Sequence, residues 1–159
     1  MIMHNNHQLP SFTQIDIQQF TQQLDDLLQR HLQSIDGLVT QSTFSWDNLV
    51  LPLDMLDNAL EKFWSPFAHL HAVVNSPELR QCYQQCLPKL SAYETSIGQN
   101  SALYQAFKAI SQETLNPIQK KILADKIRDF ELSGVNLPAV EKKRFETIDY
   151  TDASYQAEL

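Results

Sequence analysis

Glycine is scarce in this chain, and apolar residues recur at helical spacing over most of its length. The 159 residues include only three glycines, at Gly37, Gly98 and Gly134. Between them, apolar side chains return every three or four residues, the interval that places side chains on one face of an α-helix. The sequence therefore predicts an all-α fold.

Two long amphipathic segments set the expected architecture. Asp16 and Gln19 resemble a capping box, and one apolar face follows them as far as about Thr40. Ser45 can cap a second helix that reaches Val74, and about 29 residues would extend roughly 44 Å. Such lengths predict long antiparallel rods in a helical bundle. The two expected faces are Ile17, Phe20, Leu24, Leu27, Leu28, His31, Ile35 and Leu38, and then Leu49, Leu53, Leu56, Leu60, Phe63, Phe67 and Leu70.

Three prolines fall inside the expected rods. Pro52 and Pro66 lie in the second helix and Pro88 lies in the third. An interior proline removes a backbone donor and clashes with the carbonyl four residues earlier, which costs about 3 kcal/mol if the helix stays straight. We therefore expect kinks at these positions, or a division into shorter helices.

The later helices have clear beginnings and ends. Ser76 with Pro77, and Asn116 with Pro117, are typical helix starts, because each pairs a capping side chain with proline at the first helical position. Gly98 is expected to break or bend the third helix before a segment that carries Leu103, Phe107 and Ile110. The helix after Asn116 is expected to turn a set of residues inward: Ile118, Ile122, Ala124 or Asp125, Ile127 and Phe130.

A complete helix exit and re-entry follows between Arg128 and Pro138. Gly134 can adopt the left-handed conformation that closes a helix, and Val135 can fold back on the last turn. Pro138 is suited to open a last helix that contains Val140, Phe145 and Ile148.

Composition and charge exclude several function classes. The formal net charge is -7 and no basic patch is present, so a nucleic acid partner is not expected. No apolar run of 18 residues occurs, so no membrane span is expected. The amino terminus, MIMHNNHQLP, lacks the features of a secretory signal, and we expect a cytoplasmic protein.

Neither the cysteines nor the histidines form a convincing metal site. Cys82 and Cys86 stand one helical turn apart, but two ligands do not complete a tetrahedral site, so we interpret them as reduced packing residues. His69 and His71 are two apart on a helix and point in nearly opposite directions. We therefore predict no metal ligand and no catalytic residue, with one of these histidines packed or hydrogen-bonded and the other near solvent. A structural bond of His69 near Pro66 is one such arrangement.

Trp64 and His69 are the candidate contacts for a peptide or a protein partner. Trp64 lies beside Phe63 and Phe67 but off the main apolar face, and large rigid rings give contact area at a small loss of entropy. Packing in the core is the alternative use of these aromatic rings.

Several strings resemble, in order, the amino-terminal helical region of the thimet oligopeptidase family of zinc peptidases, in particular its oligopeptidase A branch. The first is the helix exit RDFELSGVNLP at residues 128–138. The others are LPSFTQI at 9–15, FSWDNL at 44–49, Pro52 with Leu53, SPFAHL at 65–70, VVNSPELR at 73–80 and LPKL at 87–90. The resemblance implies a flexible tail over 1–8, an oligopeptidase A-like helical domain over 9–148 and a divergent tail over 149–159.

The family's chemistry depends on a His-Glu-x-x-His helix, in which two histidines hold zinc and the glutamate activates water. None of the five histidines here is followed by glutamate. The resemblance therefore implies a non-catalytic front of a peptidase, with no cofactor in this chain and zinc in an absent catalytic domain. Natural truncation, a change of reading frame and a separately encoded remnant stay open.

Two functions are consistent with these expectations. In the first, the chain forms a wall of a substrate channel and restricts access of short peptides to a catalytic domain of the same protein. In the second, it is a stand-alone helical module without enzymatic activity, which forms a homodimer or binds another helix through an exposed apolar face.

Overall fold

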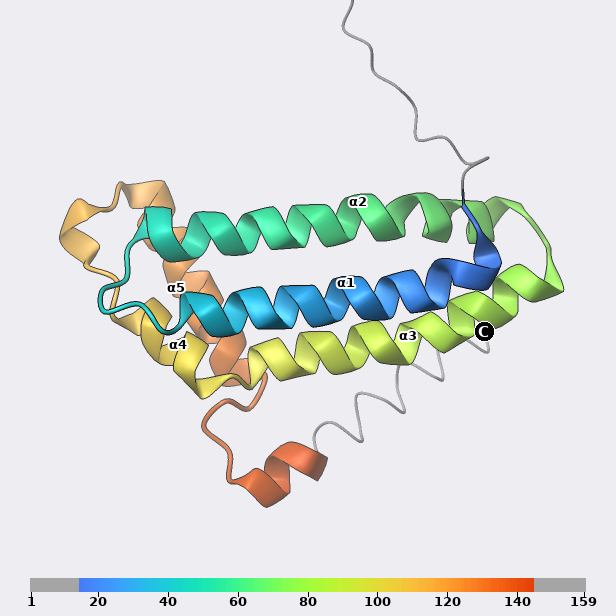
Figure 1. Ribbon diagram of the computed structural model, residues 1–159. Helices are drawn as coiled ribbons and strands as arrows, with labels where there is room; N and C mark the ends of the chain where they lie inside the picture. Colours follow the sequence, from blue (N-terminus) through green and yellow to red (C-terminus); the bar gives the residue numbers. More distant parts are fainter. Residues whose placement is uncertain (1–14, 145–159) are drawn as a thin grey trace, which may run out of the picture.

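Three long helices lie side by side and form most of the molecule. The computed structural model describes residues 15–144, and within this range it contains helices and no strand. Helix α1 (Ile17–Leu38) runs antiparallel to α2 (Leu51–Val73), and α3 (Pro77–Gly98) returns parallel to α1, as Figure 1 shows. The predicted all-α fold of long antiparallel helices is confirmed.

Local capping fixes where these rods begin. Ser45 forms a reciprocal capping box with Asn48: the Ser45 hydroxyl accepts from the Asn48 N–H at 3.2 Å, and the Asn48 side chain accepts from the Ser45 N–H at 2.8 Å. Ser76 caps α3, as predicted. Asp16 also caps α1, but its carboxylate accepts from the N–H of Gln18 at 3.0 Å, a simpler cap than the predicted box with Gln19.

The two interior prolines do not divide the helices that contain them. A π-helical turn, Trp46–Val50, leads directly into α2, so Pro52 falls in the first turn of α2. The carbonyl of Asn48, four residues earlier, accepts from the side chain of Gln41 at 3.0 Å. Helix α2 continues through Pro66, and α3 continues through Pro88. The alternative of two shorter helices at either interior proline is therefore wrong.

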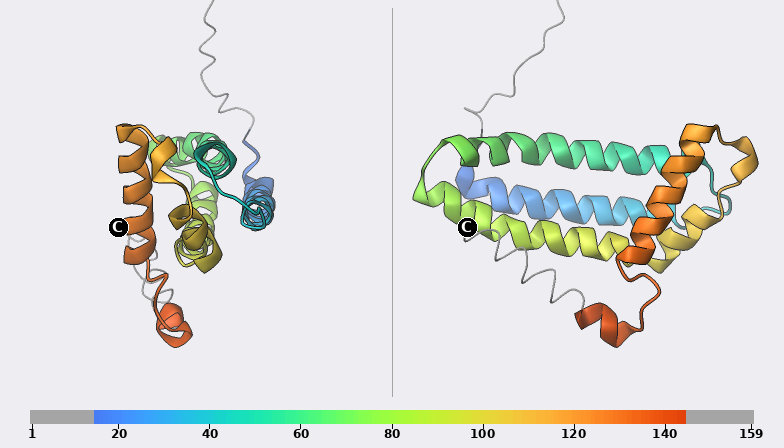
Figure 2. Two further views of the ribbon diagram at one scale, coloured as in Figure 1. Left: turned by 90° about the vertical axis from the view of Figure 1, so that its left-hand side faces the viewer. Right: turned by 180° about the vertical axis from the view of Figure 1, so that it is seen from behind.

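The remaining helices cover one end of the rods. Gly98 ends α3 as predicted, and α4 (Ser101–Lys108) leads through a 3₁₀ turn, Gln112–Thr114, to α5 (Pro117–Leu132). Helix α5 crosses the rods at a steep angle (Figure 2). Its start carries the predicted cap, because Asn116 and Gln119 form a capping box at 2.8 and 3.0 Å.

The exit of α5 is a Schellman motif built on Gly134. Gly134 has a φ of 85°, its N–H donates to the carbonyl of Glu131, and the N–H of Val135 donates to the carbonyl of Phe130. Val135 folds back and is only 3% exposed. The chain becomes helical again over 139–144, after Pro138, as predicted. Phe145, Ile148 and the two tails expected at 1–8 and 149–159 lie outside the described residues.

Two apolar clusters hold the helices together. The junction cluster packs α4 and α5 onto the adjacent ends of α1 and α2, and its most buried members are Ile35, Leu49, Val50, Leu103, Ala106, Phe107 and Leu123. The rod cluster joins the three long helices nearer their other ends, through Phe20, Leu24, Leu28, Phe67, Leu79, Cys82, Cys86 and Tyr93. The faces predicted for the first two helices supply many of these residues.

The inward face predicted for α5 is partly wrong. Ile118 is 72% exposed and Ile122 is 36% exposed, whereas Leu123 and Phe130 are buried and Ile127 is partly buried. Residues 123, 127 and 130 lie on one helical stripe, and 118 and 122 lie on another. A short helix that crosses the rods buries only the first stripe.

Candidate functional site

Trp64 belongs to an aromatic group that joins the three rods. Its ring lies 5.3 Å from that of Phe67, 6.1 Å from that of Phe20 on α1 and 5.5 Å from that of Tyr83 on α3, between ring centroids. The side chain is half-buried, so one part packs in the rod cluster and another meets solvent. Trp64 thus has the packing role that the sequence left as the alternative, and its side chain stays partly exposed.

The two histidines of α2 have different surroundings, as predicted. The ring of His71 stacks on Tyr83 with centroids 3.8 Å apart and planes at 2°. His69, the other candidate contact, has an exposed side chain. Within residues 15–144, no group of three or more histidine, cysteine or acidic side chains is placed to hold a metal ion.

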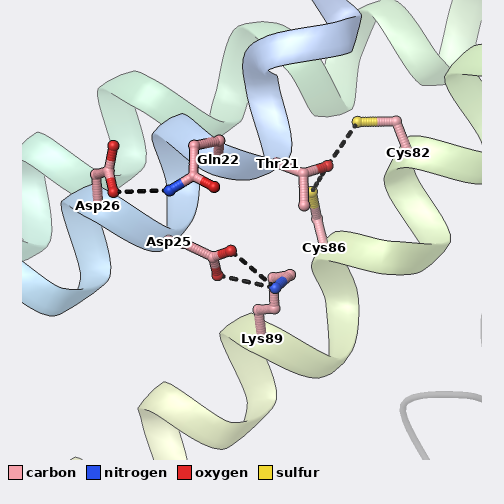
Figure 3. A network of polar contacts seen from close by, with 7 residues as sticks. All are labelled: Thr21, Gln22, Asp25, Asp26, Cys82, Cys86 and Lys89. Atoms are coloured by element: carbon pink, nitrogen blue, oxygen red, sulfur yellow. Dashed lines mark hydrogen bonds and ion pairs between the residues drawn. The ribbon is translucent and has the colours of Figure 1, made fainter.

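The two cysteines are buried, free thiols in the contact between α1 and α3 (Figure 3). The hydroxyl of Thr21 lies 3.5 Å from the sulfur of Cys82 and 3.8 Å from that of Cys86. Burial raises the pKa of Cys86 to about 12, with smaller effects from Thr21 and Cys82, so its thiol is protonated at neutral pH. One turn farther along, Lys89 bonds both carboxylate oxygens of Asp25 at 2.9 and 3.0 Å. The two cysteines are therefore reduced packing residues of the contact between α1 and α3, as predicted.

A cleft opens where α5 crosses the rods, and we call it the junction cleft. Its volume is about 260 Å³. The floor is apolar and includes Ile35, Leu53, Leu56, Ile97, Leu103 and Phe107. The charged residues that line it are Asp57 of α2, Glu94 of α3, and Lys126 and Asp129 of α5.

Charges in and beside the cleft are unevenly balanced. Lys126 is the one basic residue of the cleft lining, and its ammonium is 3.4 Å from the carboxylate of Asp54, which lies outside the lining. Desolvation is the main cause that raises the pKa of Asp57, and Lys126 opposes it. The lining therefore carries a surplus of negative charge.

A buried histidine lies next to this cleft. His31 of α1 is 5% exposed, and its ring centroid is 6.3 Å from that of Tyr93, a cleft residue. Its Nδ1 has no hydrogen-bond partner among the described residues. Burial and then the charge of Arg30 lower the pKa of His31, while Asp57 acts in the opposite direction.

Exposed apolar side chains occur on the two helices that the Lys126–Asp54 ion pair joins. They include Leu51 and Met55 on α2, which are 44% and 71% exposed, and Ile118 and Ile122 on α5. The Lys126–Asp54 ion pair joins the same two helices within a turn or so of Ile122, Leu51 and Met55. We call these four residues the α2–α5 patch.

Comparison with known proteins identifies the family. The model of the family described as neurolysin/thimet oligopeptidase, N-terminal domain, matches residues 20–143. The chain belongs to this family. The resemblance stated from the sequence is thereby confirmed.

Similar relatives of this oligopeptidase N-terminal domain come from bacteria. Oligopeptidase A of Haemophilus influenzae is 38% identical over 141 residues, which cover 86% of this chain and 21% of the relative. Oligopeptidase A of Salmonella typhimurium is 39% identical over 142 residues, with the same shares, and that of Escherichia coli is 38% identical over 143 residues, or 87% of this chain and 21% of the relative. The oligopeptidase N-terminal domain thus spans about a fifth of these relatives.

Sequence reasoning found the aromatic group but missed the junction cleft of this oligopeptidase N-terminal domain. The charged residues of the cleft come from three helices and are spread over 72 positions between Asp57 and Asp129. No local pattern marks them, because on each helix they look like ordinary solvated residues.

None of the helices described within residues 15–144 combines the length and the apolar character that a membrane span requires.

Proposed function

We propose that this chain is the non-catalytic amino-terminal domain of a cytoplasmic, zinc-dependent oligopeptidase and forms a wall of the channel through which short peptides reach the catalytic site. The observation that carries this proposal is the match of residues 20–143 to the N-terminal domain of the neurolysin/thimet oligopeptidase family. The names of the bacterial relatives, oligopeptidase A, support a peptidase as the parent protein.

The sequence supports a role without bond cleavage. None of its five histidines is followed by glutamate, so the zinc-binding helix typical of these peptidases has no counterpart in the chain. The hydrolytic zinc site would belong to another part of the parent enzyme. The role that remains is steric selection, in which a fixed wall admits extended peptides and excludes folded proteins.

The rods suit a fixed wall because their contacts are extensive and rigid. Phe20 stacks on Phe67 with ring centroids 4.0 Å apart and on Phe63 at 4.7 Å, so α1 and α2 are joined by close aromatic packing. On α2, the exposed part of Trp64 and the exposed His69 are our candidates for peptide contact.

The α2–α5 patch supports an interface with another protein surface. Exposed apolar side chains gathered from two helices are typical of contact sites. The catalytic part of the same enzyme is the occupant that we propose. A second copy of the chain is the alternative, and it corresponds to the stand-alone module that the sequence also allows.

A chimera tests the channel wall directly. Residues 20–143 would replace their counterpart in oligopeptidase A of Escherichia coli, and kcat/KM would be measured on short fluorogenic peptides and on a longer, folded substrate. We expect the chimera to hydrolyse the short peptides and spare the folded protein. In the chimera, Trp64→Ala or His69→Ala should raise KM while leaving kcat nearly unchanged, because both residues lie away from the reacting groups. Trp64→Ala also removes ring contacts with Phe20, Phe67 and Tyr83, so the melting temperature of each variant is measured as the check of folding. Unchanged kinetics in both variants would remove these residues from the proposal.

Two measurements on the isolated chain complete the test. With added zinc and a short fluorogenic peptide, we expect no hydrolysis, and chelator-sensitive cleavage would contradict the non-catalytic role. Light scattering reports the oligomeric state: a dimer that Met55→Glu dissociates would favour the stand-alone module. A monomer that binds a separately produced catalytic part, with Met55→Glu weakening the complex, would favour the peptidase domain.

A further inference from the structure

The junction cleft has the size of a small-ligand site. A cavity of 150 Å³ lined by apolar side chains accommodates benzene, and pockets for drug-sized molecules measure about 300–1,000 Å³. At about 260 Å³, the junction cleft lies between these sizes. It can therefore accept one aromatic ring or a branched aliphatic group with a short polar arm.

The floor of the cleft favours an apolar body. Leu53 and Phe107 are buried residues of the junction cluster, and Leu56 and Ile97 are partly buried against it. An apolar group that enters the cleft leaves water and gains contacts with these side chains, which is the dominant favourable contribution in small apolar sites.

The charges of the cleft decide the polar arm of the ligand. Three carboxylates, from Asp57, Glu94 and Asp129, line a space that has one ammonium, and that ammonium is paired with Asp54 at 3.4 Å. A carboxylate or phosphate ligand would meet like charge from three helices. A cation would meet opposite charge from the same three helices.

We propose that the junction cleft is a binding site for a small primary ammonium compound with an apolar body. The body occupies the floor between Leu53, Ile97 and Phe107, and the ammonium lies among Asp57, Glu94 and Asp129. The charged residues of this site come from α2, α3 and α5, its floor also draws on α1 and α4, and it does not include the candidate peptide contacts Trp64 and His69.

The test compares three probes that share a phenyl ring and differ in charge. 2-Phenylethylammonium, neutral 2-phenylethanol and anionic 3-phenylpropionate are titrated into the 159-residue chain, and ¹H–¹⁵N spectra give the dissociation constants. We expect the ammonium to bind about fivefold more tightly than the alcohol, and the carboxylate to bind more weakly than both. The shifted amides should include those of Ile97, Gly98 and Leu103.

Matched variants locate the effect. Asp57→Asn should remove most of the preference for the ammonium over the alcohol, and Glu113→Gln should leave it intact. Glu113 is an exposed acid of the 3₁₀ turn and does not line the cleft. Its substitution removes one negative charge, as Asp57→Asn does, but removes it outside the cleft. Leu56→Trp should fill the cleft and abolish binding of the ammonium and of the alcohol, with the circular dichroism spectrum as the check of folding.

The proposal fails if the three probes bind alike, if Asp57→Asn and Glu113→Gln have equal effects, or if the shifted amides lie away from the residues that line the cleft. A lack of saturable shifts at millimolar ammonium probe would also overturn it. Because these outcomes are read from the wild-type chain and conservative variants, they decide the question even if Leu56→Trp does not fold.

Discussion

Gly134→Ala should destabilise the protein, although it adds only a methyl group. Gly134 has a φ of 85°, and a side chain in this left-handed region costs about 1–2 kcal/mol. The new Cβ would also lie 2.7 Å from Cδ1 of Leu137, so that side chain must move to another rotamer. Since Leu137 is only partly covered, the movement adds a small cost, and we expect the free energy of unfolding to fall by about 2 kcal/mol.

Gly37→Ala is the matched control with the opposite expected sign. Gly37 lies in the last turn of α1, its φ is not positive, and a Cβ built there meets nothing within 4 Å. Alanine is favoured over glycine in a helix, so this variant should gain about 0.5–1 kcal/mol. The same atom is added in both variants, and only the backbone conformation and the space around it differ.

Urea denaturation followed by circular dichroism at 222 nm measures both changes, with equal m-values as the requirement for comparison. For a chain of this size, 1 kcal/mol corresponds to about 2–4 °C in Tm, so the two variants should melt roughly 5–10 °C apart. If Gly134→Ala is as stable as the wild type, or if both substitutions act in the same direction, the reasoning from the Schellman motif is refuted.

Three further predictions concern the buried groups. Phe67→Ala should lower the free energy of unfolding by about 3–5 kcal/mol in urea titrations, because Phe67 is 0% exposed and stacks on Phe20; a loss below 1 kcal/mol would contradict its place in the rod cluster. The folded state lowers the pKa of His31 from 6.5, so stability should fall as pH drops below about 6.5, where the unfolded chain takes up a proton that the folded chain resists. His31→Leu should reduce this loss between pH 7 and 5, although the raised pKa of Asp57 acts in the opposite direction at lower pH. Cys86, with a pKa raised to about 12, should react with iodoacetamide at neutral pH only as fast as the protein unfolds, and rapid labelling of the native protein would show that the thiol is accessible.

Features written in a few neighbouring residues could be predicted from the sequence. The caps at Ser45, Ser76 and Asn116 and the exit at Gly134 each need one side chain or one backbone conformation within four residues. The apolar face of α1 was also correct, since Phe20, Leu24, Leu28 and Ile35 are buried. For long rods, the period of the sequence decides which side is buried.

Features that depend on how helices meet were not predictable. On α5, two apolar stripes compete, and only the crossing angle decides that Leu123 is buried and Ile118 is exposed. The consequences of Pro52 depended on the start of α2, which follows a π-helical turn that no sequence pattern announced. Residues from all five α-helices line the junction cleft, so no single segment contains its signal.

His31 marks the boundary between the two apolar clusters along α1. Along α1, Leu28 belongs to the rod cluster and Ile35 to the junction cluster, and His31 lies buried between them. Ile97 packs against both clusters, but otherwise the two share no member among the described residues. The buried apolar side chains thus fall into two clusters linked through Ile97, and we expect amide protons on α4 and α5 to exchange with solvent in a different opening event from those around Phe67. A partner that binds at the α2–α5 patch should slow amide exchange around the junction cluster and leave exchange around the rod cluster unchanged.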